Sequence, residues 1–299
     1  MESTAESPSL NLYDPRNGDL ALNIETLELP AGDCELPRSN YFSIHWVQQG
    51  SGLFWADFGS YDFAANSLLF LVPYQLSRIA AAEPVSGLTL QFHANFLCIE
   101  THHEEVGCNG VLFNDIYGSP VVHINAIDRS EIARLFDDMG RELLGGDLAH
   151  AEVLVSYLKI LLVRATRLKL QQQEVSRSVS AKLPPELARL QAALETHFRI
   201  HHSPSAYADL LSLAPKTLAR LAKIHLRKTL TELIRERIIK QAKWELLHTL
   251  KPVKEVALEL GFQDIFYFSR LFRRATGCSP SFFRRYETEI RSGRNLSMR

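Results

Sequence analysis

The feature that most constrains the fold is a short segment near the C-terminus, GFQDIFYFSRLFRRATGCSP, at positions 261–280. Just before it, four small or apolar residues follow helical spacing: Val253, Val256, Ala257 and Leu260. Gly261 suits a left-handed helix end, and the Asp264 carboxylate can cap the helix that follows. That second helix would bury Phe268 and Phe272, which lie four residues apart. The pattern predicts a helix-turn-helix, a geometry that places a helix in the DNA major groove.

The same segment would leave a mixed face of apolar, polar and cationic side chains exposed. On or near that face we expect Ile265, Phe266, Tyr267, Ser269 and Arg270. The guanidinium of Arg270 can offer a bidentate fork to guanine, which reads sequence. Arg273 and Arg274 are placed for phosphates, which position a helix without reading sequence. The alternative is an ordinary helical hairpin with a solvated basic face.

A weaker copy of the pattern precedes this one, with Ala208 at the small-residue position and Ser212 four residues later. Its second helix would cover 215–223 and bury Leu218 and Leu221. The side chains that we expect to face DNA on this helix are Lys216, Thr217, Ala219, Arg220 and Lys223.

A helical stretch over 230–247 separates the two copies. At ~1.5 Å per residue it would form a rod of roughly 27 Å. Successive major-groove faces lie about 34 Å apart. Such a rod could therefore hold two helices in successive major grooves.

Charge is divided unevenly along the 299-residue chain, although its formal net charge is only −1. Residues 1–182 hold 12 Lys and Arg against 23 Asp and Glu, a net charge of −11. Residues 183–299 hold 21 against 11, a net charge of +10. We expect only the basic half to meet a polyanion, unless solvated charge has clustered by chance.

Over roughly 184–286 these residues resemble the AraC/XylS family of bacterial transcription regulators. The most specific matches are Ala257, Gly261, Phe262, Tyr267, Phe268, Ser269, Arg270, Phe272, Gly277, Ser279, Pro280 and Arg284. The resemblance implies a seven-helix DNA-binding domain in which one long helix joins two helix-turn-helix units. The base-facing residues it implies are Lys216, Ala219 and Arg220 in the first unit and Ile265, Phe266, Ser269 and Arg270 in the second.

The chain departs from the family pattern around the first unit. Ser212 stands for a glycine or small polar residue, Ala214 for a cap serine and Arg227 for a glycine. In the second unit, Ile265 and Phe266 are apolar where base contacts are expected. They favour contact with a thymine methyl group, or partial insertion, over hydrogen bonding.

Short alternating segments in the N-terminal half predict an antiparallel barrel or sandwich. Residues 41–48 and 53–58 look like a hairpin, with Phe42, Ile44 and Trp46 on one face. The region is also similar to the cupin-type barrel of many family members, with Gln75 where the family often has histidine. That resemblance implies a small-molecule effector. The pocket candidates, chosen by strand position and polarity, are His45, Trp55, Gln75 and His93.

Helical periodicity begins near 128, where Asp128 or Ser130 could cap a helix. A second helix carries a wide leucine stripe that could pack within the chain or against a partner helix in a homodimer: Leu154, Leu158, Leu161, Leu162 and Leu168. The expected fold is α+β: a cupin-like effector barrel over 1–128, a helical dimerisation pair over 129–172, a linker over 173–183, a DNA-binding domain over 184–288 and a tail over 289–299.

Other chemistry has weaker support. A metalloenzyme would need three inward ligands, and the candidate histidines are His45, His93, His102, His103 and His123. Because His102 and His103 are adjacent, they could not both point inward from one strand. Cys98 and Cys108 could meet across a hairpin as a redox pair, but two buried small side chains are the favoured interpretation.

We therefore expect a regulator that binds promoter DNA specifically and responds to a small effector. We expect no enzymatic activity, no metal and no cofactor, with a homodimer as the assembly and RNA polymerase as a further candidate partner. The start of the chain lacks a signal pattern and no apolar run is long enough to span a bilayer, so we expect a cytoplasmic protein without membrane contact. The alternatives are a cupin-type metalloenzyme or redox sensor with an attached DNA-binding domain, and a purely architectural DNA binder.

Overall fold

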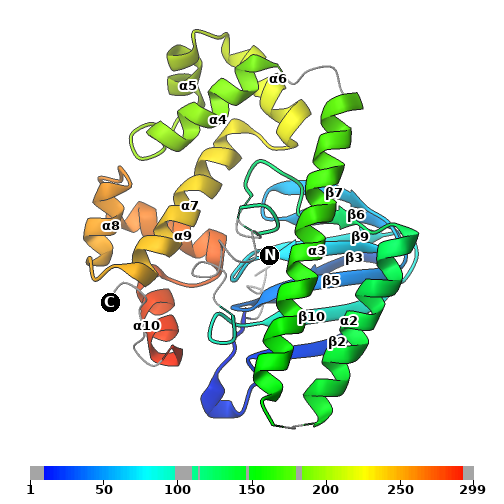
Figure 1. The fold of residues 1–299 in the computed structure, drawn as a ribbon. Coiled ribbons are helices and arrows are strands. Elements are labelled where there is room, and N and C mark those ends of the chain that lie inside the picture. The colour runs from blue at the N-terminus through cyan, green and yellow to red at the C-terminus, as the bar shows by residue number, and fades with distance from the viewer. Residues whose placement is uncertain (1–9, 98–109, 114, 146–147, 180–183, 292–299) are drawn as a thin grey trace, which may run out of the picture. The chain divides into compact units, whose positions relative to one another are not determined.

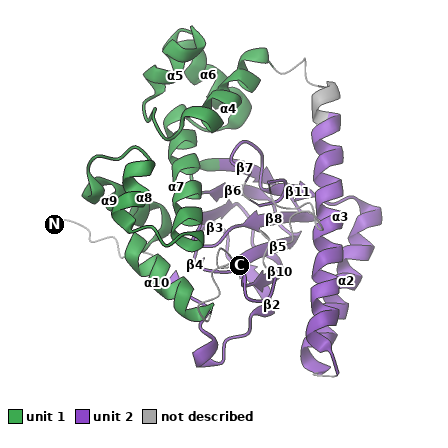
Figure 2. Cartoon of the chain, turned by 60° about the vertical axis from the view of Figure 1, so that its left-hand side comes forward, with its two compact units in different colours: residues 1–8, 57–59, 182–299 green, residues 9–56, 60–181 purple. Residues whose placement is uncertain are grey.

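The computed structural model describes residues 10–97, 110–113, 115–145, 148–179 and 184–291, the side chains of 176–179 excepted. They form two compact units (Figure 2). We call residues 9–56 and 60–181 the N-terminal domain, and the unit built on 182–299 the C-terminal domain. No helix among the described residues has both the length and the apolar character that a bilayer crossing requires.

The N-terminal domain contains two antiparallel sheets rather than the closed barrel that we expected (Figure 1). The five-stranded sheet has the order β11-β8-β5-β10-β2, with bounds Val121–His123, Ser67–Leu71, Phe42–Gln49, Val85–Phe92 and Leu22–Leu29. The four-stranded sheet has the order β3-β9-β6-β7, with bounds Gly32–Leu36, Ser77–Ala81, Gly52–Ala56 and Gly59–Phe63. A short parallel pair joins β1 (Leu10–Asn11) to β4 (Arg38–Ser39), and a 3-10 turn covers Pro15–Asn17.

The expected hairpin between 41–48 and 53–58 is wrong, because its two strands lie in different sheets. Both edges of β5 are occupied, one by β8 and the other by β10. β6 instead pairs with β9 in the four-stranded sheet. β5 is central because its apolar residues are buried on both of its faces.

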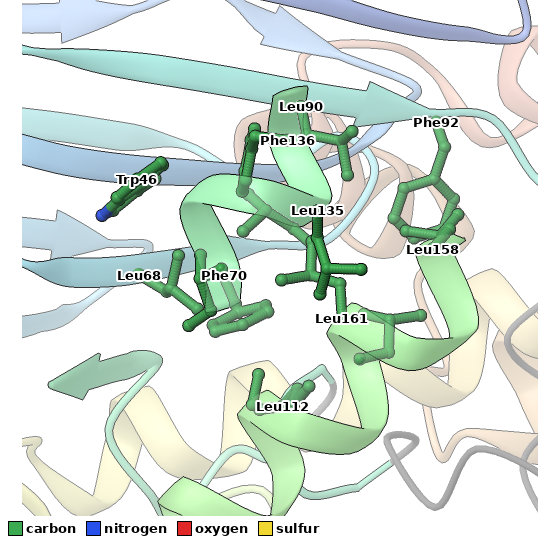
Figure 3. Packing of buried hydrophobic residues seen from close by; sticks show 14 of the residues in the cluster. Trp46, Leu68, Phe70, Leu90, Phe92, Leu112, Leu135, Phe136, Leu158 and Leu161 are labelled. Atoms are coloured by element: carbon green, nitrogen blue, oxygen red, sulfur yellow. The ribbon is translucent and has the colours of Figure 1, made fainter. Parts of the chain in front are cut away.

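Each face of the five-stranded sheet covers its own core. Phe42, Ile44 and Trp46 share one face, as expected, and pack in the cluster that includes residues of α2 and α3. In Figure 3, Trp46 lies beside Phe136 of α2. On the opposite face, Val47 and Leu69 pack with Phe54 of the other sheet. The two sheets therefore form a sandwich with helices on one outer side.

Two helices, α2 (Ala126–Gly145) and α3 (His150–Val179), cover the outer face of the five-stranded sheet (Figure 1). The cap of α2 is neither Asp128 nor Ser130: the Asn125 side-chain oxygen accepts from the amides of Ile127 and Asp128, at 2.9 Å each. α3 continues through most of the residues expected to form the linker, since Gln, Glu and Arg are good helix formers.

The five leucines of the expected dimer stripe are buried inside the N-terminal domain. Each is at most 7% exposed and belongs to the core between α2, α3 and the sheet: Leu154, Leu158, Leu161, Leu162 and Leu168. The sheet supplies the apolar partner that the stripe requires. These side chains are therefore not available to a second copy of the chain.

The described part of the C-terminal domain contains seven helices, the number that the resemblance implied. They are α4 (Pro185–His197), α5 (Pro204–Leu211), α6 (Pro215–Leu226), α7 (Leu230–His248), α8 (Val253–Glu259), α9 (Ile265–Thr276) and α10 (Pro280–Ile290). α5 and α6 form the first helix-turn-helix, α8 and α9 form the second, and α7 joins them (Figure 1).

Candidate DNA interface

The turn of the second helix-turn-helix is formed as the sequence predicts. Gly261 adopts φ +84°, and the amide of Phe262 donates to the Ala257 carbonyl at 2.9 Å, which closes the end of α8. The Asp264 carboxylate then accepts from the amides of Phe266 and Tyr267, at 2.8 and 3.1 Å, and caps α9. The two ends fix the direction in which α9 leaves the turn.

Aromatic side chains hold α9 against its neighbours. The ring of Phe268 lies 5.4 Å from Phe262 and 6.1 Å from Phe272, and Phe272 lies 5.5 Å from Phe283 of α10. Phe268 and Phe272 are completely buried. Aromatic pairs at these distances add to the free energy of simple burial. α9 is therefore a rigid support for its outer face.

The outer face of α9 carries most of the predicted DNA-facing residues. Phe266, Tyr267, Arg270, Arg273 and Arg274 are exposed, and Ile265 and Ser269 are half-buried. The guanidinium of Arg270 lies 3.8 Å from the Asp264 carboxylate, and its side chain remains 70% exposed. Because both partners are exposed, this ion pair is weak enough to yield to a base or a phosphate.

The first helix-turn-helix has the same backbone geometry with different residues. The amide of Leu213 donates to the Ala208 carbonyl at 2.9 Å, as Phe262 does to Ala257. Ser212 takes the left-handed conformation, with φ 54°, that a glycine usually fills. The α6 N-terminus begins at Ala214 without a side-chain cap.

Exposure on α6 follows the expectation for its outer face. Lys216, Ala219, Arg220 and Lys223 are exposed, and Thr217 is half-buried. Leu218 is buried as expected, but Leu221 is only half-buried, because Ala222 and Leu226 fill the core positions beside it. Four of the five side chains are exposed as expected, and their contact with DNA stays a prediction. The prediction that Leu221 belongs to the core is wrong.

Ser212→Gly should stabilise the C-terminal domain. A non-glycine residue in the left-handed region costs about 1–2 kcal/mol, and glycine returns about 0.5–1 kcal/mol of that as chain entropy. We expect a net gain of roughly 0.5–1 kcal/mol, seen as a thermal midpoint raised by a few degrees. Ser205→Gly, inside α5, is the matched control and should lower the midpoint. A lower midpoint for Ser212→Gly would show that the serine side chain supports the turn.

A buried carboxylate network that the sequence did not reveal links α7 to its neighbours. The Glu245 side chain is 5% exposed and lies 3.3 Å from the Arg199 guanidinium and 3.4 Å from the Lys251 ammonium. Lys251 also lies 2.6 Å from Glu259 of α8. The available signal was a glutamate at a core position of α7, one residue before the buried Leu246. These contacts fix α8 to the joining helix.

The segment between α4 and α5 packs against the turn of the second helix-turn-helix. The His202 ring lies 4.7 Å from the Phe262 ring. A Cβ atom added to Gly261 would lie 2.1 Å from the Arg199 carbonyl oxygen. The segment that leads into the first helix-turn-helix is therefore in direct contact with the turn of the second.

The four effector-pocket candidates have different neighbours in the N-terminal domain. His45 faces the sandwich interior, where its Nδ1 lies 2.8 Å from the Thr89 hydroxyl. Trp55 stacks under Arg78, at 4.2 Å. Gln75 accepts from the Val72 amide in a turn, and His93 packs against the Tyr13 ring.

His45 is the candidate with the most unusual environment. It is 6% exposed, and its Nε2 has no hydrogen-bond partner among the described residues. Burial lowers the pKa of His45 from its usual 6.5 to about 4, because a charged ring would lose its hydration. The ring is therefore neutral near pH 7, with one nitrogen able to bond a polar group.

The metal and redox sites that the sequence raised as alternatives remain predictions. Cys98, Cys108, His102 and His103 lie outside the described residues. Among the residues that are described, no group of three or more His, Cys, Asp or Glu side chains is placed to hold a metal ion.

A family model described as a helix-turn-helix domain matches residues 207–286, which include both helix-turn-helix units. The transcriptional activator RhaS of Enterobacter sp. (strain 638) is 37% identical over 112 residues, which cover 38% of each chain. RhaS of Shigella dysenteriae is 25% identical over 301 residues, covering 96% of this chain and 97% of that one. Both helix-turn-helix units therefore lie in a domain of the AraC type.

A solved structure of apo ToxT from Vibrio cholerae is a more distant match to this chain. It is 14% identical and covers 89% of this chain and 97% of its own, with a TM-score of 0.39. The chain thus matches Enterobacter RhaS over only 38% of the length of either protein.

Proposed function

We propose that the protein is a transcription regulator that binds promoter DNA in a sequence-specific manner through both helix-turn-helix units. The observation that carries the proposal is the shared geometry of the two units, each of which presents a second helix with exposed polar and cationic side chains on its outer face. α7, with its 19 residues, gives a rod of about 28 Å between them. That length is close to the spacing of successive major grooves.

Phosphate attraction and base recognition are separable on α9. Arg270→Ala should cost ~1–3 kcal/mol of binding free energy and relax preference at one base pair, since a bidentate contact to guanine is lost. Arg273→Ala should weaken binding to all sequences about equally, since a phosphate contact carries no sequence information. Both effects can be measured by titrating each variant against a matched and a scrambled duplex. If Arg270→Ala leaves affinity and preference unchanged, α9 does not read bases.

We extend the proposal to a small effector bound by the N-terminal domain. The support is His45, which presents a buried nitrogen without a described partner beside the hydroxyl of Thr89. A ligand with a hydroxyl or carbonyl group could satisfy that nitrogen. Family members often form homodimers, and we keep that assembly in the proposal, although the five leucines named above cannot form its interface. RNA polymerase remains a proposed partner.

The relatives are named as transcriptional activators, which supports a regulatory protein over a cupin-type enzyme. The same titration distinguishes a specific regulator from an architectural DNA binder, which would bind the matched and scrambled duplexes with equal affinity.

A further inference from the structure

The N-terminal edge of α9 is apolar and unusually exposed. Phe266, the second residue of the helix, is 78% exposed, more than any other aromatic side chain in the described part of the chain. Tyr267 beside it is 48% exposed, and Ile265 is half-buried. Phe268 and Phe272, on the other face of the same helix, are completely buried. Tyr267 still lies 6.0 Å from the Phe262 ring, so Phe266 is the member of this edge that is least involved in the core that holds α9.

This edge is the part of a recognition helix that approaches base edges most closely. None of its side chains can form a bidentate hydrogen bond to a purine. The Tyr267 hydroxyl can form a single hydrogen bond. The Asp264 carboxylate occupies the first amides of α9 and places a negative charge there, which disfavours a phosphate at the helix end. The N-terminal end of α9 is therefore poorly suited both to hydrogen bonding with bases and to binding a phosphate.

The major groove presents one apolar group that such an edge can contact, the C5-methyl group of thymine. α6 differs at its own N-terminal end, where Lys216 is exposed and Thr217 is half-buried. The two recognition helices are therefore chemically unequal. α6 is suited to polar and cationic contacts, and α9 is suited to apolar contact followed by Arg270.

We infer that Phe266 is a specificity-determining residue that reads a C5-methyl group in the half-site bound by α9. This inference rests on the proposed DNA-binding function. The half-site should contain a thymine at the contacted position, and 5-methylcytosine should substitute for it in part, because it carries its methyl group on the same ring carbon. Cytosine and deoxyuridine, which lack the methyl group, should be disfavoured.

The test uses the full chain and the tightest duplex that it selects from a random library. That duplex is resynthesised with deoxyuridine at each thymine in turn. At the contacted position, we expect wild-type affinity to fall about fourfold, the equivalent of one buried methyl group. 5-Methylcytosine paired with guanine should bind more tightly there than cytosine paired with guanine.

Variants then assign the effect to Phe266. Phe266→Ala should bind the thymine duplex more weakly and should lose the distinction between thymine and deoxyuridine. Phe266→Leu, which keeps an apolar side chain, should retain part of it. Leu258→Ala, which shortens an exposed apolar side chain on α8, is the matched control and should retain the full fourfold difference. Thermal unfolding of each variant separates loss of contact from loss of fold.

Three outcomes would overturn the inference, and they differ in meaning. If the wild type selects one sequence but binds its thymine and deoxyuridine forms equally, methyl readout fails and the proposed function stands. If Phe266→Ala weakens binding while deoxyuridine has no effect, Phe266 acts as a wedge between base steps instead. If the wild type selects no sequence, the proposed function fails together with the inference.

Discussion

Gly261→Ala should destabilise the C-terminal domain by about 2–5 kcal/mol, a large effect for the addition of one methyl group. Two costs combine. A left-handed φ of +84° strains any side chain by about 1–2 kcal/mol. The new Cβ would also lie 2.1 Å from the Arg199 carbonyl oxygen, and overpacking against backbone costs about 1–3 kcal/mol more.

A matched variant separates the two costs. Gly18 has almost the same φ, +83°, but a Cβ there would meet nothing within 4 Å. Gly18→Ala should therefore show the strain alone. For Gly261→Ala, the loss of stability is measured by hydrogen exchange of the α8–α9 amides, compared with wild type. Equal losses for the two variants would show that the junction between Arg199 and the turn relaxes freely, which would contradict a rigid contact there.

Acid should destabilise the N-terminal domain through His45. The folded-state pKa of about 4 lies below the unfolded value near 6.5, so the unfolded chain binds a proton that the folded domain excludes. The contribution of His45 to the unfolding free energy is fully present above pH 6.5. It falls as pH decreases through that value and is lost near pH 4. The full loss corresponds to about 3 kcal/mol at 1.36 kcal/mol for each pKa unit.

The difference between wild type and His45→Gln isolates this effect, since the carboxylates titrate in both. We expect the difference in unfolding free energy between the two proteins to change by about 3 kcal/mol between pH 7 and pH 4. Hydrogen exchange of the β5 amides reports it. His150→Gln, at an exposed site on α3, should leave the wild-type pH profile unchanged. If the difference in unfolding free energy between wild type and His45→Gln did not change with pH either, His45 would be hydrated or hydrogen-bonded at acid pH.

Sequence predicted the C-terminal domain better than the N-terminal domain for a physical reason. The second helix-turn-helix is specified locally: its cap, its turn glycine and its buried phenylalanines lie within twenty residues. The pairing of β5 with β8 and β10 depends on residues far along the chain, so neighbouring segments were wrongly paired. The spacing of apolar residues within a strand shows which side chains share a face, but it does not show which strands pair with it.

The candidate sites followed the same division. The sequence correctly predicted which side of α6 and of α9 is exposed, because helical spacing assigns each residue to a face. The leucine stripe of α3 shows that a helix needs an apolar partner, but it does not say whether a sheet or a second chain supplies it. Glu245 and Arg199 were missed because their interaction forms only when α7 packs beside the end of α4.

The most direct test of the central claim, specific DNA binding, is to mix the purified full chain with sheared genomic DNA of its source at physiological salt and sequence the retained fragments. We expect a few discrete sites upstream of genes, and we expect Arg270→Ala to reduce their enrichment over bulk DNA. Retention spread evenly over the genome, with or without added cell extract to supply an effector, would contradict a sequence-specific regulator.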